Sequence, residues 1–262
     1  MRLPTAKTAL DLTFQLVPFL SAALLIIAFY FARTEESPTF NFSKEDGLLE
    51  WGTVFFFTCC ACLSLLALHS KRQELSKAER RFLVLFAVLL IIGIGEELSW
   101  GKRIVGWDVP AIVSETAGNP IQTDDTSLHN LRFTFSWGHV NPSDLIFSFF
   151  LPIGLFIQGI LLPLGLRRND PRAVRIVSRW GFFVPSLKTG ALLFICAFLL
   201  HRLKGVEGVT DVREYEEFFI PFVFSFIIVD YYFRDSKVHA VLQGGLIVTV
   251  LLWLNVSLYL FS

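Results

Sequence analysis

The third apolar stretch of the chain ends in two adjacent carboxylates. Phe82 to Gly95 carries no charged side chain and runs directly into Glu96 and Glu97. Fourteen helical residues cover only about 21 Å, so these carboxylates should lie below the surface of an apolar layer roughly 30 Å thick. Carboxylates at such a depth are costly unless they are paired or act as acids, bases or metal ligands. Glu96 and Glu97 are therefore our first candidate catalytic residues.

The two glutamates cannot share one direction, because adjacent helical residues point about 100° apart. We expect Glu97 to face a cavity and Glu96 to be held by Arg103, two turns further along the same face. The alternative is that Glu96 and Arg103 pair locally and only end the helix. Trp100 falls at the same helix end, where an aromatic belt is expected, and is grouped with Arg103 among the binding residues.

Two further acids stand at the start of other apolar stretches. Glu50 lies one turn into the second stretch and shares a face with Asp46, for which a first-turn helix position is a sufficient structural explanation. Glu217 opens the sixth stretch, where Arg213 can pair with it at i+4. Pro221 one turn later is expected to kink that helix and free a backbone carbonyl. Glu50 and Glu217 are assigned to binding.

A polar connection at residues 101–142 holds the one dense cluster of proton- or metal-competent side chains in the sequence. His129 and Asn130 lie in it. A lone loop histidine is more often a surface residue, but this loop starts directly after Glu97 and is tethered over the same end of the protein. We assign His129 to catalysis and Asn130 to binding. Glu97, His129 and Glu217 could together hold a divalent metal ion, the cofactor that their oxygen and nitrogen atoms suit.

The elements that must position these residues follow from composition. The chain has 262 residues, of which 53% are hydrophobic and 15% aromatic, with 23 basic and 23 acidic side chains and a mean hydropathy of +0.57. This is too apolar for a soluble enzyme, a disordered chain or a nucleic-acid-binding protein. The apolar runs are continuous rather than alternating, which excludes strands of a membrane barrel.

The sequence predicts an all-α, polytopic membrane helical bundle of about seven transmembrane helices. Each run is close to the roughly 20 residues that one crossing needs. We expect one integral membrane domain over residues 1–262, with a long outer loop at 101–142. The expected spans are residues 12–32, 47–69, 82–100, 143–166, 185–201, 217–233 and 239–261.

Positive charge predicts the orientation of these spans. The N-terminus and alternate connections carry fifteen Lys and Arg residues, while the other connections carry eight. Because positively charged loops stay cytoplasmic, the N-terminus is expected inside and the C-terminus outside. Seventeen of the acids then fall at or near the outer face. The arginines from Arg167 to Arg179 are interspersed with apolar residues and are expected to lie along anionic cytoplasmic headgroups.

Three motifs resemble those of an uncharacterised bacterial family of multi-pass membrane proteins. They are EDGxxEW at residues 45–51, GEExSWGxRI at 95–104 and LHN at 128–130. The resemblance extends to about the fourth span and implies a bacterial inner (cytoplasmic) membrane protein, but the family has no settled activity. Seven spans with scattered acids and histidines are also similar to alkaline ceramidases and related membrane hydrolases. Here, however, the His-x-x-x-His of their last span is absent and the expected orientation is opposite.

Three functions fit these residues. The first is a metal-assisted hydrolase or transferase that acts on a lipid or lipid-linked substrate at an outward-facing acidic and histidine site. The second is a proton- or cation-coupled transporter, although no inverted repeat is found. The third is a structural or assembly subunit whose acidic face binds a membrane-protein partner. Membrane lipids are expected partners in every case, and nucleic acid in none.

Overall fold

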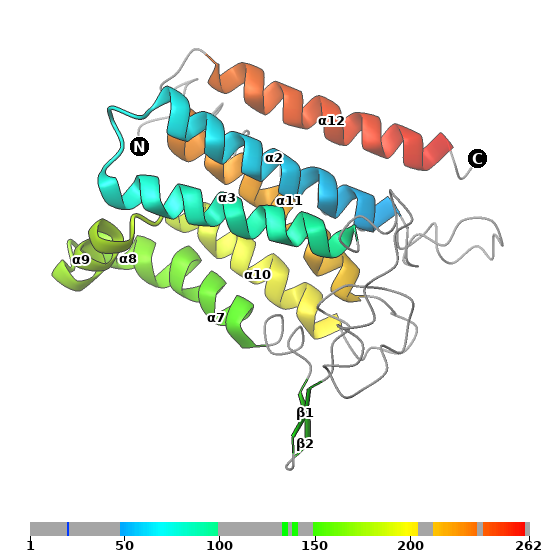
Figure 1. Cartoon of the computed structure of the whole chain (residues 1–262), viewed down its shortest axis with the longest axis horizontal. Coiled ribbons are helices and arrows are strands. Elements are labelled where there is room, and N and C mark those ends of the chain that lie inside the picture. The colour runs from blue at the N-terminus through cyan, green and yellow to red at the C-terminus, as the bar shows by residue number, and fades with distance from the viewer. Residues whose placement is uncertain are drawn as a thin grey trace, which may run out of the picture.

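The computed structural model describes residues 48–98, 133–135, 138–140, 149–203, 212–234 and 238–259, together with Leu20. Apart from one small hairpin and short connections these residues are helical, which confirms the predicted all-α class. Successive long helices run alternately in opposite directions, so their connections fall at two ends of an elongated bundle (Figure 1). The helices are α2 (Leu48–Ser70), α3 (Lys77–Glu97), α7 (Leu151–Phe156), α8 (Leu162–Arg167), α9 (Pro171–Trp180), α10 (Leu187–Leu203), α11 (Val212–Phe233) and α12 (His239–Tyr259), with a π-helical turn, η4 (Ile157–Leu161), between α7 and α8.

The six predicted stretches from residues 47–69 onward each overlap a helix, whereas the first, residues 12–32, lies outside the described residues apart from Leu20. The third helix begins earlier than hydrophobicity alone predicts, at Lys77 instead of residue 82. A capping box causes this, because the Ser76 hydroxyl accepts from the Glu79 N–H and the Glu79 carboxylate accepts from the Ser76 N–H. Polar residues thus extend the helix by more than one turn.

Aromatic side chains from α2 and α11 form the centre of the bundle. The Phe56 ring meets Phe218 and Phe222 edge to face, with ring centroids 5.6 and 4.9 Å apart. All three side chains are buried, and edge-to-face geometry is favourable for aromatic pairs. Next to them the Cys60 thiol donates to the Pro221 carbonyl across 3.2 Å. α2 and α11 therefore form one closely packed pair.

A second aromatic cluster centres on Phe183, in the non-helical segment between α9 and α10. Its fully buried ring contacts Phe82, Phe86 and Phe224 at centroid distances of 5.5, 5.5 and 5.7 Å. The Gln158 side chain donates to the Phe183 carbonyl across 2.9 Å. The packing of the Phe183 ring and the hydrogen bond from the Gln158 side chain to the Phe183 carbonyl therefore both hold this segment in place.

The π turn lies where α7 and α8 cross α10. Pro163 has no N–H to donate to the Gly159 carbonyl, so a regular α-helical pattern cannot continue there, and the Leu162 N–H instead reaches the Ile157 carbonyl. Gly159 and Gly190 face each other at the crossing. A Cβ atom on Gly159 would lie 2.6 Å from the Gly190 carbonyl oxygen. Small residues at this point allow the two backbones to touch.

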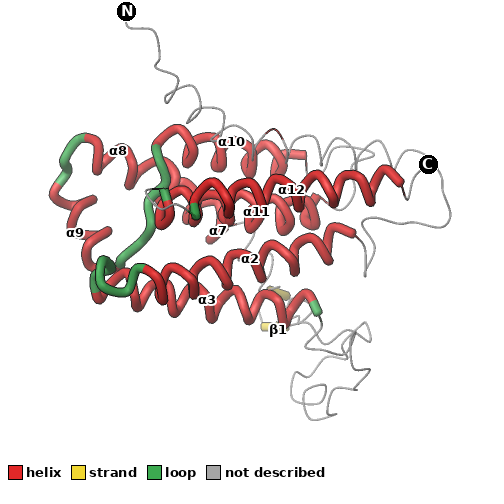
Figure 2. The backbone as a smooth tube through the Cα atoms, turned by 90° about the horizontal axis from the view of Figure 1, so that it is seen from above, coloured by secondary structure: helices red, strands yellow, loops and turns green. Residues whose placement is uncertain are grey.

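Helix α9 was not predicted from the sequence, which placed its arginines in a loop. It crosses the end of the bundle between α8 and α3 (Figure 2). The Asp170 carboxylate caps its start by accepting from the Arg172 N–H, and Pro171 occupies its first turn. Gly181 ends it at φ 72°, where a Cβ would collide with the backbone at Ala78.

Within the expected outer loop the described residues form an antiparallel hairpin of β1 (Phe133–Phe135) and β2 (Gly138–Val140). Phe133 pairs with Val140, and Phe135 with Gly138.

Among the described residues one helix, Trp51–Ser70, is long and apolar enough to cross a membrane. Three shorter apolar stretches are Leu151–Arg167, Leu187–Leu199 and His239–Thr249.

Candidate functional site

The acidic end of the bundle is formed by the start of α2, the end of α3 and the start of α11 (Figure 1). Glu96 and Glu97 lie on the last turn of α3 and are half-buried. Glu217, on the second turn of α11, is only 7% exposed. None of these three glutamates lacks an interaction partner. The structure therefore brings helix ends that carry acids from separate parts of the sequence to one end of the fold.

Packing between α2 and α11 buries Glu217. Phe218 beside it contacts Phe56 of α2, and Thr53, one turn before Phe56, is fully buried at that level. Pro221, four residues after Glu217, has no N–H for the Glu217 carbonyl. Glu217 thus has a buried side chain on a turn that Pro221 interrupts, and a carboxylate in such surroundings is stable only with polar partners.

Four of the predicted site residues, Trp100, Arg103, His129 and Asn130, lie outside the described residues. Glu50 belongs to α2, but its side chain is also outside them. Within the described part of the chain no three His, Cys, Asp or Glu side chains gather in a way that could hold a metal ion. The assignment of Glu97, His129 and Glu217 to a metal site stays a prediction.

The opposite end of the bundle is basic. Among the side chains that the structure describes it carries twelve Lys and Arg against four acids, whereas the acidic end carries three acids, Glu96, Glu97 and Glu217, and no Lys or Arg. The basic residues are Lys71, Arg72, Lys77, Arg80, Arg81, Arg167, Arg168, Arg172, Arg175, Arg179, Lys188 and Arg234. The helices thus separate the two signs of charge along the length of the bundle.

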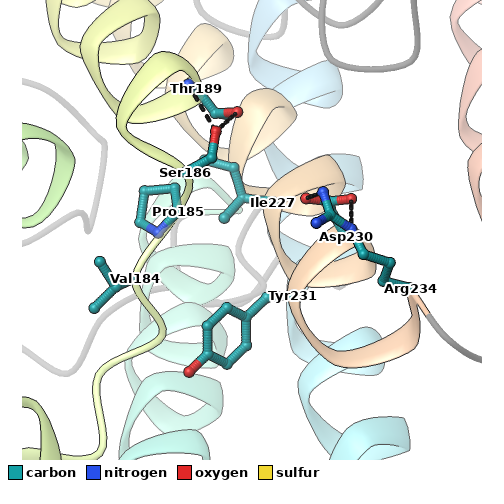
Figure 3. Close-up of a pocket in the computed structure, with 8 residues that line it drawn as sticks. All are labelled: Val184, Pro185, Ser186, Thr189, Ile227, Asp230, Tyr231 and Arg234. Carbon is teal, nitrogen blue, oxygen red and sulfur yellow. Dashed lines mark hydrogen bonds and ion pairs between the residues drawn. The ribbon is translucent and has the colours of Figure 1, made fainter. Parts of the chain in front are cut away.

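A polar pocket of about 280 Å³ opens at this basic end, between the start of α10 and the last turns of α11 (Figure 3). The Ser186 hydroxyl accepts from the Thr189 N–H and lies 2.8 Å from the Thr189 hydroxyl, which fixes both side chains. Across the pocket, Arg234 binds both carboxylate oxygens of Asp230 at 3.1 and 2.8 Å. Hydroxyl groups, a carboxylate and a guanidinium therefore share one opening.

Asp230 also approaches α12, because His239 Nε2 lies 3.8 Å from its Oδ1 atom. Gln243, one turn further along α12, is buried. Within the described residues, Tyr232 Oη, His239 Nε2 and Gln243 Oε1 are buried atoms with no hydrogen-bond partner. Unsatisfied polar atoms are uncommon in folded proteins and mark this part of the bundle as unusual.

This basic-end site is not among the sites predicted from the sequence. One signal was present: Asp230 interrupts an otherwise apolar run, and Arg234 follows at the i+4 spacing of a helical ion pair. The contributions of Ser186 and Thr189 had no such signal, because their relation to Asp230 depends on the packing of α10 against α11.

Comparisons of this chain with protein-family models, with curated proteins and with solved structures find no match. Function must therefore be argued from the residues themselves.

Proposed function

We propose that the chain is a seven-span integral membrane protein of the bacterial cytoplasmic membrane, with the N-terminus inside and the C-terminus outside. The main support is apolar surface that the bundle leaves uncovered. Val84, Leu85, Val88 and Leu89 form an exposed face on α3, between charged residues at both ends of that helix. An apolar face of this length is costly in water and favourable in hydrocarbon.

Features of the other helices also support a membrane location. Exposed large apolar side chains occur on α7, α10 and α12, including Phe156, Phe198 and Leu252. The contact between Gly159 and Gly190 is a small-residue crossing of the kind that packs helices within lipid. Charged residues concentrate at the two bundle ends, where headgroups and water would lie. The basic end would then be cytoplasmic and the acidic end outward-facing.

We place the functional site at the acidic end and propose hydrolysis or group transfer on a lipid or lipid-linked substrate. The observation that carries this proposal is the buried carboxyl group of Glu217 on α11, which packs against α2 as does α3, the helix that ends in Glu96 and Glu97. Carboxyl groups in different environments can divide the roles of acid and base. Glu217 lies among apolar residues, whereas Glu97 lies at a helix end, so the pair suits proton transfer at a site entered from the membrane.

A divalent metal ion would add Lewis-acid chemistry if His129 supplied the nitrogen ligand beside Glu97 and Glu217. Carboxylate oxygen and imidazole nitrogen are suitable donors. Because the described residues alone form no three-ligand group, no step here depends on a metal. The chain's own carboxyl groups move the proton and orient the substrate, and Arg103 is proposed to orient Glu96.

An ion-coupled transporter is less favoured by the packing of α11. Glu217 and Asp230 lie on this helix near opposite bundle ends, and a carrier would need a polar route between them. The residues between them that face the core are apolar, including the buried rings of Phe222 and Phe226. Ser225 is the one buried polar side chain in this interval, and it donates to the carbonyl of Phe222 in its own helix. An assembly subunit with an acidic docking face remains the second candidate.

The test is turnover of lipids by the purified full-length protein in neutral detergent. The protein is incubated with a bacterial lipid extract, and the products are followed by mass spectrometry. Glu217→Gln and Glu97→Gln should each abolish product formation, because both remove a carboxyl group from the proposed site. Glu74→Gln is the matched control, since Glu74 is exposed at the opposite end and pairs with Lys71 at 3.1 Å.

Two results would contradict the enzyme proposal. One is turnover by both glutamine variants at the parent rate. The other is the absence of any product from the parent protein, in which case cross-linking of the acidic end to a basic membrane-protein partner becomes the expected finding.

A further inference from the structure

Helix α9 carries two opposed faces. Arg172, Arg175 and Arg179 follow the helical spacing of three and four residues and share one face. Ala173 and Val177 lie on the other side of the helix, while Ile176 and Trp180, four and eight residues after Arg172, lie along the border between the two sides. A helix of this kind is stable where one side meets charge or water and the other meets apolar material.

The bundle covers only part of the apolar side. Ala173 packs against α8 and is buried. Val174, Ile176 and Trp180 remain 48%, 41% and 58% exposed. Val174 also lines a groove of about 340 Å³ between α9 and the rest of the bundle, whose other apolar walls are Leu166, Val177 and Phe182. Intramolecular packing therefore leaves the apolar edge of α9 without a cover.

The three arginine side chains of α9 are also available to an external partner. No ion pair to Arg172, Arg175 or Arg179 forms within the described part of the chain. The Asp170 carboxylate beside them caps the helix through the Arg172 backbone N–H. Most of the other basic side chains of the bundle lie at this same end. The guanidinium groups of α9, unpaired within the described residues, therefore favour an anionic partner.

We infer that α9 lies on the membrane surface and binds anionic phospholipids, with phosphate groups at Arg172, Arg175 and Arg179 and acyl chains against Ile176 and Trp180. This inference rests on the proposed membrane location. An anionic lipid supplies both negative charge and hydrocarbon to one short helix. Nucleic acid or an acidic protein surface would satisfy the arginines and leave the apolar edge in water.

The test measures binding of phosphatidylglycerol and phosphatidylcholine to the full-length protein in neutral detergent, by native mass spectrometry. The parent protein should prefer phosphatidylglycerol. Replacing Arg172, Arg175 and Arg179 together by Gln should weaken phosphatidylglycerol binding by about a hundredfold, at roughly fivefold per arginine, and leave phosphatidylcholine binding unchanged. Ile176→Gln with Trp180→Gln should weaken both lipids, because this pair of changes removes the apolar contact and keeps the charge.

The matched control removes the same charge elsewhere at the basic end. Arg72→Gln, Lys77→Gln and Arg81→Gln alter three exposed residues of α3 and the turn before it, outside α9, and should change phosphatidylglycerol binding only slightly. Equal loss in the two triple variants would mean diffuse charge attraction and would overturn the assignment to α9. Competition by millimolar inorganic phosphate would also overturn it, since the site would then recognise free phosphate.

Failure of the membrane proposal is recognised separately. The parent protein and all variants should stay in the membrane pellet after alkaline carbonate extraction. Extraction of the parent would refute the membrane location itself. A parent that resists extraction but shows no preference for phosphatidylglycerol would refute only the inference about α9.

Discussion

The crossing of Gly159 and Gly190 gives the sharpest test of how this bundle is packed. We consider Gly190→Ala on α10. The added Cβ would lie 2.6 Å from the Gly159 Cα and 2.7 Å from its carbonyl carbon, and closer still to the carbonyl oxygen. Carbon atoms pack best at about 3.5 to 4.0 Å, so the two backbones must separate by about 1 Å.

The size of the effect follows from that separation. A gap of up to about 1 Å forfeits a quarter to a half of the dispersion energy of the atoms at the crossing, and forced insertion of a methyl group into a packed interface costs about 1–3 kcal/mol. Alanine itself is favoured over glycine in a helix by about 1 kcal/mol. The difference is a net loss of about 0–2 kcal/mol, and we expect the upper half of this range, about 1–2 kcal/mol, because relief by side-chain rotation is impossible when both neighbours are backbone.

The assay is reversible unfolding of the full-length protein in mixed detergent micelles, followed by circular dichroism. Gly244→Ala on α12 is the matched control, since a Cβ there meets nothing within 4 Å, and it should be neutral or stabilising by up to about 1 kcal/mol. Equal stability of the two variants would refute the backbone contact. Gly159→Ala tests the partner side of the crossing and should be destabilising as well.

Two other predictions concern the core and the topology. Phe183→Ala should lower the free energy of unfolding by about 3–5 kcal/mol, because its ring is fully buried; Phe182→Ala, at a half-buried neighbour, should cost clearly less, and comparable losses in the same unfolding assay would contradict the aromatic cluster. Reporter fusions placed after Ser262 and within residues 70–81 should report opposite sides of the membrane, as seven spans with an inside N-terminus require, and the same side for both would refute the proposed orientation.

Long apolar runs made most of the helices predictable from the sequence. α2, α10 and α12 come from continuous hydrophobic segments, and their bounds fall within a few residues of those expected. α9 was missed because a ten-residue, arginine-rich segment has no such run. Its signals were local: Asp170 and Pro171 at the start and Gly181 at the end are the residue types that open and close helices.

The candidate sites also differ in whether the sequence predicts them. An acid that follows an apolar run, such as Glu217, is visible in the sequence, because burial of a charge can be expected from its neighbours. The pocket at the basic end was not visible. Ser186 and Asp230 are far apart in the chain, and only the packing of α10 on α11 brings them to one opening. His129 lies outside the described residues, so its predicted relation to Glu97 stays untested.

The π turn between α7 and α8 also determines which side of this helix faces the bundle. Leu155, Gly159 and Pro163 are all buried although they recur every four residues, a spacing that drifts by about 40° per step in a regular α-helix. The wider turn takes up one extra residue and brings Pro163 back onto the side that holds Leu155. A regular α-helix over the same eight residues would turn Pro163 about 80° away from Leu155, whereas a helix one residue shorter would keep the two aligned without the wide turn. The wide turn thus lets a segment with one extra residue bury the same side along its whole length.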